Sequence, residues 1–168
     1  MNEVAELSMV RVALVREAST PYPARNAGDV ADLARAVIGD ADREVFLVLC
    51  LDTRLRVNAA HVAAIGTIDS CPITPRGVFT AALLCGAASV VLAHNHPSGD
   101  PRPSPEDHAM TARLVEAGEI LGIPVQDHVI LGQGGAYSFR GKGQMPKPAG
   151  PRLPAGPRGR RMQPADPD

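Results

Sequence analysis

The chain has 168 residues, which suits one domain with short appendages. Hydrophobic residues make up 45% of it, and because aromatic residues make up only 3%, the expected core must be aliphatic. A net charge of −1 argues against binding of nucleic acid through the overall charge of the chain. A membrane span is not expected either, because no segment reaches roughly 18 consecutive apolar residues.

The cysteines and the first residues bear on the cellular compartment. Cys50, Cys71 and Cys85 lack the spacing of a zinc finger, and each lies among apolar neighbours. They are predicted to be buried free thiols, which suits a reducing compartment. The first residues lack a basic region followed by an apolar core, so no signal peptide is expected and a cytoplasmic location is predicted.

The first half of the chain predicts strands and one helix. Residues 7–15 are rich in β-forming side chains and predict a strand, and residues 19–28 form a polar connection with two prolines. Residues 29–38 carry apolar side chains at helical intervals. Residues 44–51 are apolar nearly throughout, which predicts a strand buried on both faces, and residues 55–65 are its expected hairpin partner.

The second half continues the alternation of helices and strands. Helices are predicted over residues 77–86, with Pro75 at the start, and 105–121, and strands over 89–96, 125–131 and 137–139. Short connections between alternating elements favour a layered, mixed α/β domain.

Residues 141–168 differ in composition from the rest. They contain seven prolines and five glycines, and such a segment buries too little surface to offset its ordering entropy. We therefore predict an N-terminal strand and connection over residues 1–28, a domain over 29–140 and a disordered tail over 141–168. Residues 142–168 carry six basic and two acidic side chains, a charge of +4 that leaves −5 for the remainder. The tail's basic cluster, Arg158-x-Arg160-Arg161, is compatible with contact to nucleic acid or an acidic partner, although a solvated extension without function is the simpler interpretation.

The residues that carry chemistry begin at the end of the strand predicted over 89–96. Side chains alternate across a strand, so His94 and His96 point the same way and Asn95 points the other way. A Pro/Gly-rich turn leads to Ser104, which has the features of a helix N-cap, and Asp107 in the first turn can point back toward the histidines. Two histidines and one carboxylate, with a fourth position left for water, form the ligand set of a catalytic zinc.

Simpler explanations exist for the same residues. Ser104 and Asp107 resemble a capping box, and capping alone would account for both. Glu44 lies at the start of a predicted strand and would complete the site, but it would equally serve as an exposed partner of Arg43 or Arg54. The joint pattern, which reads His-x-His, seven residues and Ser-x-x-Asp, is much rarer by chance than either half alone.

The segment from His94 to Asp107 resembles the JAMM motif of JAB/MPN-domain metalloproteins, specifically of their RadC-like branch. The resemblance extends from about Asp29 to about Phe139 and includes Asp127-His128. One departure is Thr74-Pro75-Arg76-Gly77, where the family often has His-Pro-Arg-Glu. This departure lies outside the metal motif, so it concerns the surroundings of that turn or a partner surface.

The resemblance implies an α/β fold with a mixed, curved β-sheet flanked by helices, in the three-layer manner of the cytidine deaminases. It also implies one Zn²⁺ per chain, held by His94, His96 and Asp107, and cleavage of an amide or isopeptide bond in an unknown protein or peptide substrate. Glu44 would act as general base toward a zinc-bound water and then as general acid toward the leaving amine. Ser104 would donate a hydrogen bond to the tetrahedral oxyanion.

Three alternatives fit less well. A zinc deaminase needs His-x-Glu together with Pro-Cys-x-x-Cys, but here His96 stands at the position of that glutamate and no Cys-x-x-Cys exists. The letters His-Asn-His do not indicate an HNH nuclease, whose name refers to residues dispersed over a ββα unit. The third alternative is a non-catalytic module, associated with DNA repair or binding another protein, that retains zinc.

The biological role is less defined than the chemistry. RadC-like proteins bear a DNA-repair label, and longer members carry an N-terminal helix-hairpin-helix region. Only about 28 residues precede the first expected helix here, so that region is expected to be missing and the label transfers weakly. In this respect the chain resembles members found on mobile elements.

Overall fold

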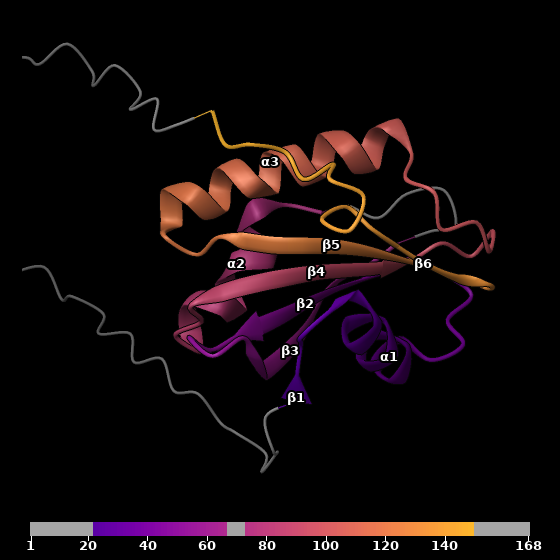
Figure 1. The fold of residues 1–168 in the computed structure, drawn as a ribbon, viewed down its shortest axis with the longest axis horizontal. Helices are drawn as coiled ribbons and strands as arrows, with labels where there is room; N and C mark the ends of the chain where they lie inside the picture. The colour runs from indigo at the N-terminus through magenta and orange to yellow at the C-terminus, as the bar shows by residue number, and fades with distance from the viewer. Residues whose placement is uncertain (1–21, 67–72, 150–168) are drawn as a thin grey trace, which may run out of the picture.

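The computed structural model describes residues 22–66 and 73–149, and these form a layered α/β domain (Figure 1). Its strands form one mixed, curved sheet in the order β1-β3-β2-β4-β5-β6. The strands are Tyr22–Pro23 (β1), Val45–Leu51 (β2), Arg56–Ile65 (β3), Ser89–Asn95 (β4), Val125–Gly132 (β5) and Gly135–Ser138 (β6). The helices are Ala27–Ile38 (α1), Pro75–Leu84 (α2) and Pro105–Leu121 (α3). In the ranges given above, none of the helices is long and apolar enough to cross a membrane.

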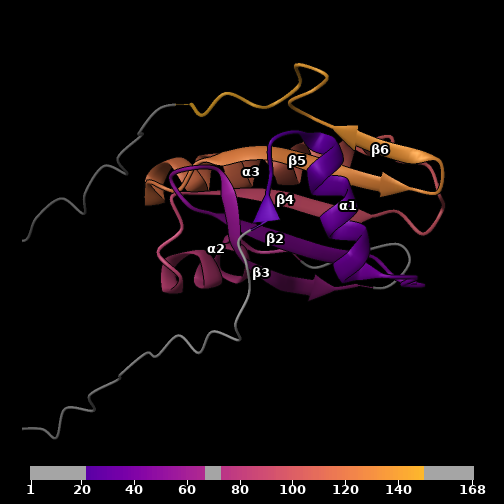
Figure 2. The same ribbon diagram turned by 60° about the horizontal axis from the view of Figure 1, so that its bottom comes forward.

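Strand β2 lies in the middle of the sheet and is buried on both faces, as predicted. One set of its side chains packs with α1, namely Leu47, Leu49 and Leu51. The alternate set packs with α2 and α3, namely Phe46, Val48 and Cys50. Helix α1 therefore covers one face of the sheet and the other two helices cover the opposite face (Figure 2).

Helix boundaries follow their capping residues. Helix α1 begins two residues before the predicted start, because Asn26 caps it by accepting a hydrogen bond from Asp29 N at 3.0 Å. Helix α2 begins at Pro75, because Thr74 accepts from Gly77 N at 3.1 Å and proline suits the first helical position. Gly86, predicted to end α2, lies beyond it with a positive φ of 63°.

Smaller differences concern the strands and the cysteines. Strand β4 ends at Asn95, one residue earlier than predicted, and β6 begins at Gly135. Cys50 and Cys85 are buried free thiols, as predicted. The strand predicted over 7–15 and Cys71 lie outside the described residues.

Strand pairing brings the functional residues to one face of the sheet. Strands β2 and β4 are antiparallel and pair Phe46 with His94. Because strand side chains alternate, Glu44 faces the same side of the sheet as the histidines. Strands β4 and β5 are parallel and pair Leu92 with His128. Parallel neighbours need a crossover, and α3 supplies it on the face to which His94 points.

Residues beyond the boundary predicted at residue 140 contact the domain. Lys142 N donates to Ser138 O at 3.0 Å and Gln144 N donates to Phe139 O at 2.8 Å. Met145 packs against the core cluster between the sheet and helices α2 and α3. Composition did not reveal this contact, because a single apolar side chain in a Pro/Gly-rich segment gives no periodic signal.

A chain ending at Ala149 is expected to unfold within about 2 °C of the full-length chain, because the removed segment has the composition of a solvated tail. A chain ending at Gly141 lacks Met145, which is partly buried. Its free energy of unfolding should fall by roughly 1 kcal/mol, about half the contribution of a fully buried methionine, and its Tm by about 4 °C. Thermal denaturation of the three chains measures both effects. Equal Tm values for the two shortened chains would show that Met145 does not stabilise the fold.

Candidate metal centre

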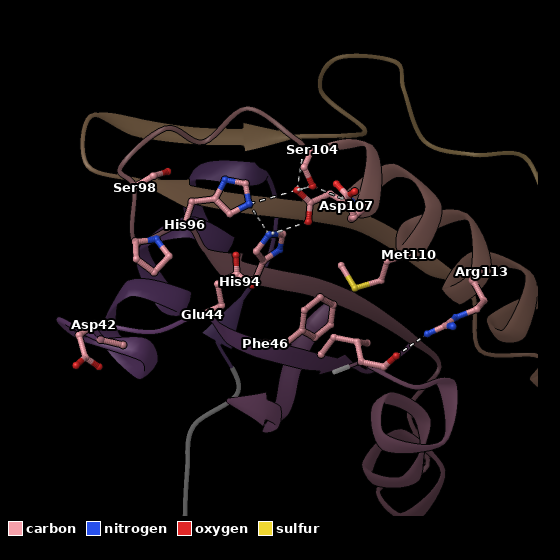
Figure 3. Close-up of a pocket in the computed structure, with 14 residues that line it drawn as sticks. Asp42, Glu44, Phe46, His94, His96, Ser98, Ser104, Asp107, Met110 and Arg113 are labelled. Atoms are coloured by element: carbon pink, nitrogen blue, oxygen red, sulfur yellow. Dashed lines mark hydrogen bonds and ion pairs between the residues drawn. The ribbon is translucent and has the colours of Figure 1, made fainter. Parts of the chain in front are cut away.

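His94, His96 and Asp107 converge at the end of β4 and the start of α3 (Figure 3). The Nε2 atoms of the two histidines lie 2.9 Å apart. Asp107 places Oδ1 3.2 Å from His94 Nε2 and Oδ2 3.3 Å from His96 Nε2. His94 and Asp107 are buried, and His96 is half-buried at the edge of a groove. The three side chains thus offer ligand atoms to one common point, and together they could hold a metal ion.

The second nitrogen of each histidine is already engaged. His96 Nδ1 lies 2.8 Å from the backbone oxygen of Asp100, and a carbonyl can only accept, so Nδ1 carries the proton. In the neutral ring the Nε2 lone pair is then directed to the common point. His94 Nδ1 lies 2.8 Å from Nε2 of His128. Hydrogen bonds of this kind orient metal-binding imidazoles in known sites.

The electrostatics of the cluster call for a cation. Burial raises the pKa of Asp107, but the contacts of its carboxylate oxygens with the His94 and His96 rings outweigh burial and hold this pKa well below its usual range. The same contact with Asp107 raises the pKa of His96. An anionic carboxylate beside two imidazole nitrogens needs a proton or a metal ion between them. Two imidazoles and one carboxylate suit zinc and leave a fourth position for water.

Ser104 and Asp107 form the capping box that the sequence suggested. Ser104 Oγ accepts from Asp107 N at 3.1 Å and donates to Asp107 Oδ2 at 2.8 Å, while Ser104 N donates to the same oxygen at 2.8 Å. The capping role and the position beside the histidines therefore coexist. The hydroxyl proton expected to stabilise an oxyanion is donated to Asp107 in this structure.

Glu44 immediately precedes β2 and lines the groove beside His94 and His96 (Figure 3). Its backbone is fixed on both sides, because Gly66 N donates to Glu44 O at 2.9 Å and Asn95 holds the residues around it. Asn95 Oδ1 accepts from Val45 N at 2.8 Å, and its Nδ2 donates to Arg43 O at 2.9 Å. Both hydrogen bonds of the Asn95 amide are therefore with the backbone. This clamp ties the position of Glu44 to the last residue of β4, which stands between the two histidines in the sequence.

The groove has a volume of about 910 Å³. Phe46 and Met110 lie on one side of the cluster, with Arg113 beyond them (Figure 3). Together with Ile73, which lines the same groove and belongs to the same core cluster, they form an apolar wall. Arg113 donates to the backbone oxygen of Ile73. Such a groove can hold an apolar side chain next to a bond positioned at the cluster.

Several functional contacts were not foreseen. No role in the site was assigned from the sequence to His128, whose ring contacts His94, or to Thr111, which contacts His128. The carboxylate of Asp100 pairs with Arg102 at 2.6 Å, whereas the backbone oxygen of Asp100 contacts His96.

Comparison with known proteins identifies the family. The sequence model of the RadC-like JAB domain matches residues 24–144. The chain belongs to the RadC-like JAB domain family. The resemblance and the α/β fold predicted from the sequence are thereby confirmed.

Relatives described as UPF0758 proteins agree with this assignment. One from Desulforamulus reducens is 45% identical over 139 residues, which cover 83% of this chain and 61% of the relative. One from Thermotoga maritima is 48% identical over 104 residues, 62% of this chain and 47% of the relative. One from Methanosarcina barkeri is 43% identical over 115 residues, which cover 68% of this chain and 50% of the relative. The chain therefore spans about half to three fifths of the length of these relatives.

The pKa shifts predict a stability maximum near pH 6.5 for the zinc-free protein. His96 has a raised pKa through its hydrogen bond to Asp107, so its protonation stabilises the fold below the unfolded pKa of about 6.5 and the gain is lost as pH rises through the folded pKa. Burial lowers the pKa of His128 far below its usual value, so stability falls as pH drops below about 6.5.

Thermal denaturation of chelator-treated protein between pH 5 and pH 9 measures this profile. His96→Ala is the control, because it should remove the loss of stability above about pH 6.5 and keep the loss below it. A wild-type profile that rises steadily from pH 6.5 to pH 8 would contradict the assigned role of His96.

Proposed function

We propose that the protein is a zinc-dependent hydrolase that cleaves an amide or isopeptide bond in a protein or peptide. The observation that carries this proposal is the convergence of two imidazole nitrogens and a buried carboxylate beside Glu44, at the floor of an open groove. A structural zinc has four protein ligands, whereas the cluster in the described residues offers three. This difference favours the hydrolase over a non-catalytic module that retains zinc.

Each side chain has a role in the proposed reaction. Zn²⁺ held by His94, His96 and Asp107 would lower the pKa of a bound water to about 7 and polarise the substrate carbonyl. Glu44 accepts the proton of the attacking water and later gives it to the leaving amine. The Ser104 hydroxyl turns from Asp107 toward the oxyanion, a donation worth roughly 3 kcal/mol in comparable sites. The apolar wall of Phe46, Ile73 and Met110 holds a side chain next to the scissile bond.

The wider biological statements remain predictions. They are the cytoplasmic location, the link to DNA repair or mobile elements, and the contact of the basic tail with nucleic acid. The tail prediction rests on Arg158, Arg160 and Arg161, which lie outside the described residues.

Metal analysis and an activity screen test the proposal together. The purified protein should contain one zinc per chain, and it should cleave some member of a panel of peptides and isopeptide-linked conjugates. A chelator should abolish this cleavage and added zinc should restore it. The proposal is overturned if the protein takes up no zinc, or if it cleaves nucleic acid in a zinc-dependent manner and none of the peptide or isopeptide panel.

A further inference from the structure

His128 lies directly behind the candidate metal centre and outside the groove. It is fully buried on β5, stacked on Phe139 with ring centroids 5.3 Å apart and tilted against Phe46 at 5.6 Å. Both of its ring nitrogens have partners, since Nε2 lies 2.8 Å from His94 Nδ1 and Nδ1 lies 2.7 Å from Thr111 Oγ1. His128 is thus held at both nitrogens, one of them by a candidate metal ligand. Its partners therefore determine which of its two nitrogens donates a proton and which accepts one.

That direction is set by Thr111. Its hydroxyl lies 2.6 Å from the backbone oxygen of Asp107, one helical turn earlier, and a carbonyl can only accept. The single hydroxyl proton is therefore donated to Asp107 O, so Oγ1 accepts the proton of His128 Nδ1. Neutral His128 then has a bare Nε2, which accepts from His94 Nδ1. At the end of this chain, His94 Nε2 carries no proton.

We propose that Thr111 and His128 act as positioning residues, forming a relay that holds His94 in the one neutral tautomer able to bind a metal. This inference rests on the proposed zinc site and adds to it the residues that prepare one ligand. The opposite direction would leave a proton on His94 Nε2, where Asp107 Oδ1 at 3.2 Å would accept it. That arrangement is favourable without zinc, so a device that excludes it raises the affinity for the metal.

The relay also joins the two elements that hold the ligands. It begins at the backbone of Asp107 on α3, passes through β5 and ends at His94 on β4. His96 needs no relay, because a backbone carbonyl fixes its ring and no side-chain substitution can reverse that bond. The tautomer of His94 therefore depends on side chains, and Thr111 can be changed without touching the metal ligands.

The test compares Thr111→Val with Thr111→Ser in the full-length chain. Valine keeps the shape of threonine but removes the hydroxyl, so His128 Nδ1–H loses its acceptor and the relay can reverse. Serine keeps the hydroxyl and loses only a methyl group. Zinc affinity, measured by competition with a chelator, should fall 10- to 100-fold in Thr111→Val and stay within about threefold of wild type in Thr111→Ser.

A spectroscopic readout separates positioning from general damage. In ¹⁵N-histidine spectra at pH 8, the zinc-free wild type and Thr111→Ser should show His94 protonated at Nδ1, and Thr111→Val should show it protonated at Nε2. The inference is overturned if zinc-free wild type has the Nε2–H form, or if both variants bind zinc equally. If wild type takes up no zinc, the proposed function fails, while the spectra still decide whether the relay exists.

Discussion

Replacing His96 or Asp107 with alanine is expected to abolish stoichiometric zinc binding. Each variant leaves two of the three protein ligands, which is fewer than a catalytic zinc site uses. His108→Ala is the matched control, because this histidine lies next to Asp107 on α3 but is exposed. Elemental analysis should give about one zinc per chain for wild type and His108→Ala, and near zero for the two ligand variants.

The two ligand variants differ in their effect on the fold. Asp107→Ala also removes half of the capping box at the start of α3, so roughly 1 kcal/mol of stability should be lost in addition to the metal. His96 caps no helix, and its loss should affect zinc far more than the stability of the zinc-free protein. Full zinc occupancy in either variant would show that the metal binds elsewhere in the protein.

The sequence was informative where local geometry fixes the side chains. His94 and His96 share a face because strand side chains alternate, and Ser104 and Asp107 are placed by the capping of one helix turn. These four residues come together through one strand, one turn and one helix start. The pattern alone therefore predicted the candidate centre, and the family resemblance supported Glu44 as its partner without revealing what surrounds Glu44.

Contacts that depend on strand register could not be predicted in the same way. His128 reaches His94 only because β5 lies parallel to β4 with Leu92 opposite His128, and neither strand encodes that offset locally. Thr111 joins them because α3 crosses over this face of the sheet. The four-residue spacing between Asp107 and Thr111 was a usable signal, since it places both on one face of the helix. The spacing alone does not identify the partner of Thr111, which is His128 on β5.

Asn95 shows how one local rule has a consequence elsewhere in the chain. Alternation directs it away from the cluster, and there its amide binds the backbone on either side of Glu44. The segment from His94 to His96, at the end of β4, thus carries two candidate ligands on one face and the support of the proposed general base on the other. The distance in sequence between Glu44 and the histidines is closed by this amide and by the antiparallel pairing of β2 with β4.

Glu44→Gln is expected to retain zinc and thermal stability while losing roughly 10²- to 10⁴-fold in hydrolytic rate, the usual size of general acid–base catalysis. Glutamine keeps the shape and the hydrogen-bonding capacity of the side chain but cannot accept the proton of the attacking water. Asp42→Asn is the matched control, because Asp42 is an exposed carboxylate that lines the same groove. It should keep its rate within about threefold, since the change is remote from the proton transfer.

The measurement uses whichever peptide or isopeptide substrate the wild type cleaves, with zinc content determined on the same samples. Retained zinc with a low kcat in Glu44→Gln, and near wild-type values in Asp42→Asn, would identify the carboxylate of Glu44 as the proton carrier. Loss of zinc in Glu44→Gln would instead make this residue a fourth ligand. Because four protein ligands close the position that water needs, that result would turn the site into a structural one. Wild-type activity in Glu44→Gln would rule out the mechanism.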